Sequence, residues 1–160
     1  MKTKRSATLA GIALAVLVTT GAESSGCAPQ ADDNRPKVEG SVIGGRCTQR
    51  LTAYPYILAG QIKAYADSIC REAVKEHSLT VIIQQRNTAG AWVEVGKASN
   101  HVSPALGVQK DVTVTIACKP GVYRAKMDAT VETVKDRGAA PGHATITTEA
   151  KTYSAEDCQK

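Results

Sequence analysis

Hydrophobic and polar residues alternate along several segments of this chain, a pattern typical of β-strands that are buried on one face. In the clearest segment, 107–118, valines, an isoleucine and a cysteine fall on one face, while Gln, Asp and Thr fall on the other. After a Lys-Pro-Gly turn, the segment 122–134 repeats the alternation, with Tyr123, Ala125, Met127, Ala129 and Val131 on one side. Both segments are therefore predicted to be half-buried strands of antiparallel sheets.

Three more segments, 78–86, 91–97 and 143–153, are predicted strands because turn residues bound them and Val, Ile, Thr or Tyr is frequent in them. Asn87–Gly90 joins the first two and predicts a β-hairpin. The segment 57–73 fits two structures, since its apolar residues recur at helical spacing but also partly alternate. We predict a strand there, because the neighbouring segments are predicted strands.

The start of the chain has the three parts of a secretory signal peptide. Residues 1–22 combine a basic start, a twelve-residue apolar run over 7–18 and small residues before Glu23. The run is shorter than the about 20 residues that a membrane-spanning helix needs. Residues 23–37 are polar, contain prolines and lack periodicity, so we expect a flexible lead-in, followed by one domain over 38–160. Secretion is the predicted localisation.

Cys27 offers an alternative to free secretion. The chain has five cysteines, and an odd number leaves one without a partner in an exported protein. Cys27 is the natural odd one, because it lies in the polar lead-in after Ser-Ser-Gly, an imperfect form of a lipoprotein signal. Lipidation of Cys27 would anchor the protein in the cell membrane, which is the one membrane contact that the sequence indicates.

Composition narrows the function classes. Hydrophobic residues make up 42% of the 160 residues, enough for the core of one domain. Aromatic residues make up only 4% and Phe is absent, so modules that stack nucleic-acid bases on aromatic side chains are disfavoured. Three of the 20 basic residues and none of the 15 acidic ones lie within 1–22, which leaves 17 against 15 and a net charge of +2. We therefore expect no nucleic-acid partner.

The predicted strands give the fold class. We expect an all-β domain, an antiparallel two-sheet sandwich of about seven strands in the immunoglobulin-like style, preceded by the signal peptide and the lead-in. Over 62–134, a strand ending in Cys70, the sequence His-Ser-Leu-Thr-Val, a Trp hairpin and a Cys118 followed by Gly-x-Tyr-Arg come in that order. In this order the chain resembles the small secreted, uncharacterised disulfide-bonded β-sandwich proteins of actinomycetes. The resemblance implies a structural Cys70–Cys118 bridge and carries over no catalytic or binding residue.

The positions of the cysteines agree with that pairing. Four cysteines allow three connectivities. Cys70 and Cys118 each end a predicted strand on its apolar face, so a bridge between packed strands is expected there. Cys47 and Cys158 flank the domain, and the first and last strands of such sandwiches often lie close together. We predict Cys70–Cys118 and Cys47–Cys158, with Cys27 unpaired or lipidated.

No motif for metal binding or catalysis is present. The histidines at 77, 101 and 143 are too far apart in sequence for a zinc motif, and no Cys-x-x-Cys occurs, so we predict no metal and no cofactor. His77 ends a charged segment, 71–77, that we expect to be a solvated loop. Ser99 and Ser103 lie near His101, but no Gly-x-Ser-x-Gly and no orienting acid accompany them. We predict that the protein is not an enzyme.

A tryptophan, a group of basic residues and one loop are the remaining candidates for a binding surface. Trp92 is expected to fill the core between the sheets, the alternative being an exposed binding aromatic. Arg124, Lys119 and Lys126 could form a weak cationic patch, which two acidic residues on the same face would dilute: Asp128 and Glu132. The expected function is a secreted or surface-displayed binding or structural module for an extracellular or cell-envelope partner. The alternative is an enzyme with an unrecognised site or an enzyme inhibitor, for which 119–121 after Cys118 is the candidate loop.

Overall fold

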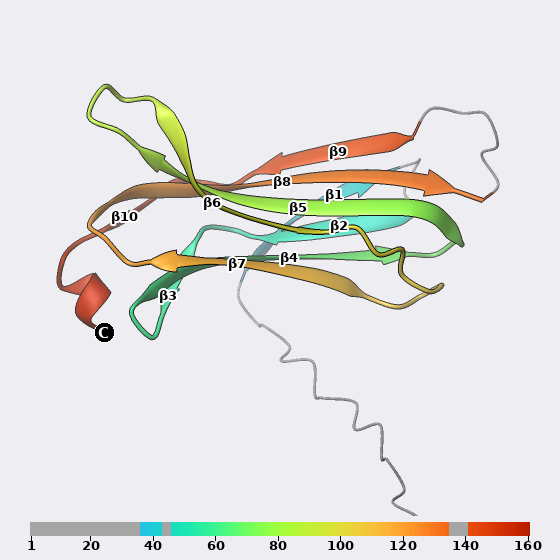
Figure 1. Cartoon of the computed structure of the whole chain (residues 1–160), viewed down its shortest axis with the longest axis horizontal. Helices are drawn as coiled ribbons and strands as arrows, with labels where there is room; N and C mark the ends of the chain where they lie inside the picture. The colour runs from blue at the N-terminus through green and yellow to red at the C-terminus, as the bar shows by residue number, and fades with distance from the viewer. Residues whose placement is uncertain (1–35, 43–45, 135–140) are drawn as a thin grey trace, which may run out of the picture. The chain divides into compact units, whose positions relative to one another are not determined.

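Two antiparallel sheets packed against each other form the domain (Figure 1). The structure is a computed structural model that describes residues 36–42, 46–134 and 141–160. The predicted signal peptide, most of the lead-in and Cys27 lie outside these residues. The all-β sandwich is confirmed, with two five-stranded sheets over the described ranges where about seven strands were expected in total.

Sheet A is built around one long central strand, β4, which crosses its full length. β7 pairs along one edge of β4, while β2 and β3 share the other edge and β1 pairs with β2. The break between β2 and β3 falls at Pro55, which has no N–H to donate to the ladder. The prediction of a strand rather than a helix within 57–73 is confirmed, although a turn at 59–60 divides the segment into β3 and β4, and β4 ends at Cys70. The strands of this sheet are β1 (Lys37–Val42), β2 (Cys47–Thr52), β3 (Tyr56–Leu58), β4 (Gln61–Cys70) and β7 (Lys110–Ala117).

Sheet B repeats this plan around the long strand β8. β5 pairs along one edge of β8, β6 pairs with β5, and β9 and β10 share the other edge of β8. At the break between β9 and β10, Thr148 makes two hydrogen bonds of 2.9 Å with Ala125 of β8. The Thr148 hydroxyl accepts from the Ala125 N–H, and the Thr148 N–H donates to the Ala125 carbonyl, so β8 keeps its hydrogen bonds there. The strands are β5 (Val74–Arg86), β6 (Trp92–Asn100), β8 (Gly121–Thr133), β9 (Gly142–Thr147) and β10 (Lys151–Tyr153).

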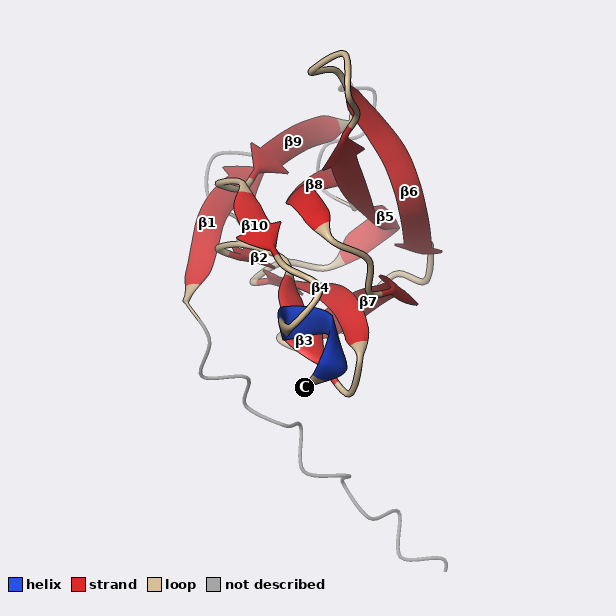
Figure 2. Cartoon of the chain, turned by 90° about the vertical axis from the view of Figure 1, so that its left-hand side faces the viewer, coloured by secondary structure: helices blue, strands red, loops and turns tan. Residues whose placement is uncertain are grey.

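The edges of the two sheets approach each other on both sides of the sandwich. β1 lies near β9, and β6 lies near β7, so the layers curve into a flattened barrel when viewed from the end (Figure 2). Gly96 of β6 makes one approach possible, because a Cβ there would collide with the Ile116 side chain of β7. Tyr153, at the end of β10, also links the two sheets, because its hydroxyl donates to the carbonyl of Pro55 between β2 and β3.

The core lies between the sheets and follows the predicted alternation. Both sheets contribute aliphatic side chains, and sheet B also contributes the two tyrosines and the methionine of this core. Tyr123 is the largest fully buried side chain, and its hydroxyl donates to the Lys119 carbonyl at 2.9 Å. The fully buried or nearly buried apolar residues of this core include Leu51, Ile62, Ala64, Ala66, Leu79, Val81, Ile83, Tyr123, Ala125, Met127 and Ala129.

The disulfides are Cys47–Cys70 and Cys118–Cys158, so the predicted pairing is wrong. Cys47 and Cys70 are direct register partners on the neighbouring strands β2 and β4, with a Cα–Cα distance of 4.1 Å. β7 is antiparallel to β4, which places Cys118 beside Gly60 before the start of β4. Cys70 ends the same ten-residue strand, roughly 30 Å away at about 3.3 Å per residue. No bridge between Cys70 and Cys118 can span that distance.

Candidate functional site

His77 lies in the core, which corrects the expectation of a solvated loop. Val74–His77 is the start of β5, and His77 has the same parity as the inward-facing Leu79, so its side chain is only 2% exposed. Its Nε2 lies 2.9 Å from the hydroxyl oxygen of Ser68, and the same oxygen accepts a hydrogen bond of 3.2 Å from the Gln49 amide. Burial, with Lys110 adding to it, lowers the pKa of His77, so the imidazole is neutral at pH 7.

This Ser68–His77 contact lacks the access that a catalytic pair needs. Both side chains are buried between the sheets, and the Ser68 hydroxyl already accepts from Gln49. The predicted candidates Ser103 and His101 line a depression of about 260 Å³, which His77 also lines. The hydroxyl of Ser103 is engaged there, because it donates to the Lys75 carbonyl at 3.2 Å. The serines and histidines of the described chain thus form no accessible nucleophile–base pair.

The histidines of the described residues belong to no cluster of metal ligands. His143 lies on β9, where its Nδ1 is 3.0 Å from the Thr130 hydroxyl. Within residues 36–42, 46–134 and 141–160, no three His, Cys, Asp or Glu side chains are grouped so that they could hold a metal ion. The described part of the chain therefore offers no ready-made metal centre.

Trp92 faces outward on sheet B, which corrects its expected place in the core. In the β5–β6 register, Ile83 pairs with Gly96 but the next residue, Gln84, pairs with Glu94, so Val95 is an extra residue in β6. Such a bulge reverses the alternation beyond it. Gly96 therefore faces the core, while Trp92 emerges on the outer face.

The indole of Trp92 is covered by an arginine from another strand. The guanidinium carbon of Arg124, on β8, lies 4.3 Å from the centre of the Trp92 ring. Gln84, on the strand between them, accepts a hydrogen bond of 2.8 Å from Nε of Arg124. Residues of three neighbouring strands therefore hold this guanidinium over the ring. Among the described residues, Arg124 has no carboxylate within ion-pair distance.

A second arginine lies next to this stack. Arg86 pairs directly with Trp92 across the hairpin, and its Nε donates to the Gly90 carbonyl at 3.2 Å. The turn matches its sequence prediction: the Asn87 side chain accepts the Ala91 N–H at 2.8 Å, and Gly90 has the positive φ of +83° that favours glycine. We call Gln84, Arg86, Trp92 and Arg124 the Trp92 face.

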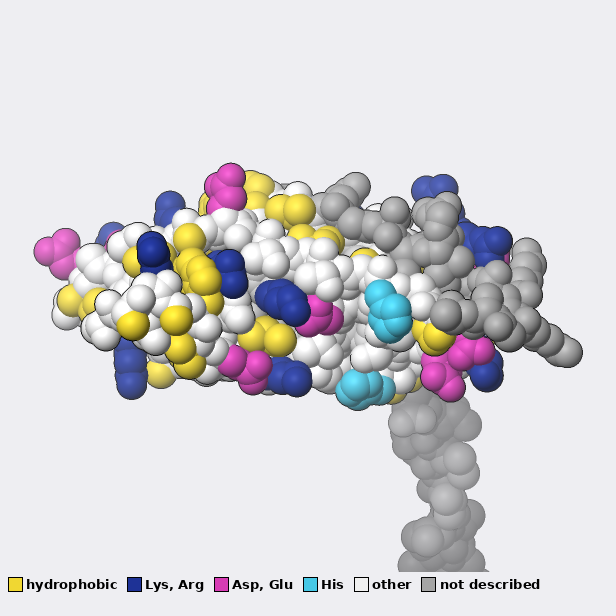
Figure 3. Space-filling view, turned by 90° about the horizontal axis from the view of Figure 1, so that it is seen from above, with side chains coloured by type: hydrophobic (Ala, Val, Ile, Leu, Met, Phe, Trp, Pro, Cys, Tyr) yellow, Lys and Arg dark blue, Asp and Glu magenta, His cyan; other side chains and the backbone are white. Residues whose placement is uncertain are grey.

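The expected cationic patch takes a different form from the one that the sequence suggested. Lys126 is paired with Asp128 at 2.9 Å, so the predicted dilution by Asp128 is present. Lys119 lies on the β7–β8 turn, and Arg86 adds a basic residue to this face, diagonal to Arg124 across the pairing of β5 with β8. Seen from the β8–β9 side, hydrophobic and basic side chains adjoin at one end of the domain, and basic and acidic ones adjoin nearer its middle (Figure 3).

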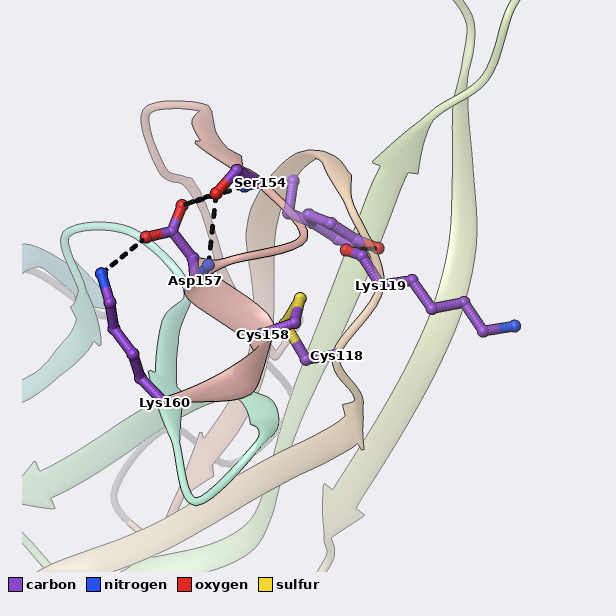
Figure 4. Close-up of a disulfide and its surroundings, with 7 residues drawn as sticks. Cys118, Lys119, Ser154, Asp157, Cys158 and Lys160 are labelled. Carbon is purple, nitrogen blue, oxygen red and sulfur yellow. Dashed lines mark hydrogen bonds and ion pairs between the residues drawn. A yellow bond between two sulfur atoms is a disulfide. The ribbon is translucent and has the colours of Figure 1, made fainter.

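The β7–β8 turn was the candidate loop for an inhibitor. Cys118 is bonded to Cys158 of the short 3-10 helix Asp157–Gln159, and the Lys119 side chain extends away from this disulfide (Figure 4). The Lys119 carbonyl, which a serine protease would have to polarise, already accepts the Tyr123 hydroxyl. The turn is rigid, but its geometry does not favour presentation of Lys119 to a protease.

A depression of about 320 Å³ lies on the inner side of the same hairpin. Val95, the bulge residue, is 39% exposed and lines it with Ile116, Ala117 and Tyr123. Gln85 and Lys119 supply its polar groups. The hairpin β5–β6 therefore carries the Trp92 face outside and a mixed apolar and polar depression inside, and its turn stands away from the two layers (Figure 1).

Sequence reasoning identified Trp92 and Arg124 separately but missed their contact. The missing signals were the bulge at Val95 and the neighbour order β6–β5–β8, which no local pattern encodes. Among the described residues, no helix is long and apolar enough to cross a membrane. No protein-family profile matches the sequence, and no curated protein matches it either.

Proposed function

We propose that this chain is an exported, non-enzymatic binding module that contacts its partner through the Trp92 face. The observation that carries the proposal is the stack of Arg124 on Trp92, which is held by Gln84 and lacks an acidic partner in the described chain. An arginine fixed in this way has lost most of its side-chain freedom before a partner arrives, so binding costs less conformational entropy. Trp and Arg are also the residues that most often dominate the energy of protein interfaces.

The two disulfides support export. Disulfides persist in oxidising compartments, and both pairs here join segments of the folded domain. The basic and apolar start of the sequence points to the same compartment. A non-enzymatic role is supported by the buried Ser68–His77 contact and by the engaged Ser103 hydroxyl. The partner that fits an exported module of this kind is a polymer of the cell envelope.

Sedimentation with purified actinomycete cell walls tests this function. We expect the wild-type domain to sediment with the walls, and Trp92→Ala to lose most of that retention. Tyr54→Ala is the matched control, because Tyr54 is also a partly exposed ring with a cation, Lys151, 5.4 Å from its centre. Equal losses in the two variants, or no retention of the wild type, would contradict the proposal.

A further inference from the structure

We propose that the Trp92 face binds the oxyanions of an acidic polymer, with Arg124 and Arg86 as the two guanidinium donors. This inference rests on the proposed function, since it names the chemistry of the partner at the same face. The shared chemistry is a chain that carries repeated carboxylate or phosphate groups.

Arg124 is oriented as a ready donor. A guanidinium has five N–H groups, and Nε of Arg124 uses one of them for Gln84 at 2.8 Å. The guanidinium carbon lies 4.3 Å from the centre of the Trp92 ring, and this contact restricts the motion of the group. The Nη edge is left for a partner, and this edge matches the two oxygens of a carboxylate or phosphate.

Arg86 provides the second donor at a suitable distance. Arg124 pairs with Gln84, and Arg86 lies two residues further along β5, so the two arginines are diagonal neighbours on one face. Such neighbours have Cα atoms about 7–8 Å apart. The Nε of Arg86 is held by the Gly90 carbonyl, so its Nη groups are also available. Two charged groups on a flexible chain can contact both arginines at once.

Sheet A contains an arginine, Arg50, whose charge is neutralised by a carboxylate of the protein itself. On sheet A, Nε of Arg50 donates to Oδ1 of the fully buried Asp67 at 2.7 Å. On sheet B, the corresponding Nε contact is made to a neutral amide. Glu94 is the register partner of Gln84, but it makes no ion pair with either arginine. An amide holds the guanidinium in place without cancelling its charge, so the charge remains available for an anion.

The shape of the face favours a polymer over a small molecule. The four residues lie on the open surface of a sheet, and the hairpin depression lies on its other side. An exposed cation binds a single small anion weakly in water, because the solvent screens the attraction. Several anionic groups on one chain raise the effective concentration at the second arginine once the first is bound.

Titration with two defined polyanions tests the inference. Sodium polyphosphate represents the phosphate source and polygalacturonate the carboxylate source, with neutral dextran as the blank and the ionic strength held constant. Trp92 is the single tryptophan of the chain, so its fluorescence reports directly on this face. Calorimetry gives the affinity independently of the indole. We expect saturable binding of at least one polyanion, with a change in Trp92 emission.

Matched variants separate a site from general charge attraction. Arg124→Gln should weaken binding about tenfold or more, because a charge-assisted bidentate contact is lost, and Arg86→Gln should weaken it several-fold. Arg71→Gln removes the same charge from the exposed β4–β5 turn at the other end of the domain and should change the affinity less than twofold. Thermal unfolding of each variant verifies that the fold is retained.

Three results would overturn the inference: no saturable binding of either polyanion, a loss for Arg71→Gln equal to that for Arg124→Gln, or binding without a change in Trp92 emission. Retention on cell walls that depends on Trp92, without polyanion binding, would refute the inference and leave the proposed function standing. Polyanion binding through Arg124, without retention on cell walls, would refute the proposed function and leave the inference standing.

Discussion

The two outer faces of this sandwich use the same parts in opposite ways. On sheet A, Asp67 is 0% exposed and binds Arg50 at 2.7 Å and Lys37 at 3.1 Å, so the cations are neutralised within the protein. On sheet B, Arg124 is stacked on Trp92 and bonded to the amide of Gln84. The first arrangement holds strands β1, β2 and β4 together. The second holds a guanidinium in position without a carboxylate among the described residues, so one carboxylate distinguishes a neutralised arginine from one that keeps its charge.

The largest expected effect comes from removal of the buried acid. Asp67→Asn leaves Arg50 and Lys37 without their shared carboxylate, and breaking a buried ion pair in this way costs about 3–5 kcal/mol. Because the side chain of Arg50 is 32% exposed, we expect a smaller loss, about 2–3 kcal/mol in the free energy of unfolding. Urea denaturation measures it. Asp111→Asn, at the exposed register partner on β7, should cost less than about 0.5 kcal/mol. Similar losses of stability for Asp67→Asn and Asp111→Asn would show that the buried carboxylate does not hold the strands of sheet A together.

The second expected effect is alkaline destabilisation through Tyr65. Burial, followed by the charge of Asp67, raises the pKa of Tyr65 from 10.0 to about 12. The folded chain therefore keeps this proton at a pH where the unfolded chain releases it, so stability is full below pH 10 and falls as the pH rises towards 12. Tyr65→Phe should make this decline shallower in denaturation curves measured from pH 9 to 12. Part of the decline should persist, since burial also raises the pKa of Tyr153 to about 12. An unchanged slope would contradict the prediction.

A third experiment gives sheet B the acid that sheet A has. Gln84→Glu keeps the shape of the side chain and supplies a carboxylate to Nε of Arg124, which should stabilise the fold by about 0.5–1 kcal/mol. The same change should reduce polyanion binding at least tenfold, because the guanidinium is then neutralised internally. Gln159→Glu, on the exposed 3-10 helix, is the control and should alter neither property. Tighter polyanion binding by Gln84→Glu would contradict the prediction that a carboxylate at position 84 neutralises Arg124.

The smallest effect on stability is expected at Arg124 itself. Arg124→Lys keeps the positive charge on a partly exposed face, so the free energy of unfolding should change by less than about 0.5 kcal/mol. The ammonium cannot reproduce the planar stack or the two-pronged contact, so Trp92 emission and polyanion affinity should both change. A loss above about 2 kcal/mol would show that this stack, like Asp67 on sheet A, mainly holds strands together.

The sequence predicted what depends on local alternation. The inward faces of β5, β7 and β8 and the turn at Asn87–Gly90 all follow from residues within a few positions of each other. Extending the alternation of β5 by one step would also have placed His77 inside. Trp92 could not be predicted in this way, because one extra residue, Val95, reverses the alternation only where β6 meets β5.

The disulfides and the Trp92 face depend instead on which strands are neighbours. Cys47 meets Cys70 because β2 pairs with β4, and Arg124 meets Trp92 because β5 lies between β8 and β6. These contacts join residues far apart in the chain, and their formation is decided by the packing of whole sheets. A single sequence gives the faces of its strands but leaves their order open.

The bond between Cys118 and Cys158 also determines how the domain carries mechanical load. It closes a covalent ring across 40 positions, and this ring contains β8, β9 and β10. A pull between residue 36 and Lys160 therefore passes from the 3-10 helix directly to the end of β7 and then into sheet A. The strands of sheet B inside the ring are bypassed, which withholds roughly 130 Å of contour length from extension. The Cys47–Cys70 bond bypasses β2, β3 and β4 in the same way, so such a pull can extend only the segments outside the two rings, which contain β1, β5, β6 and β7.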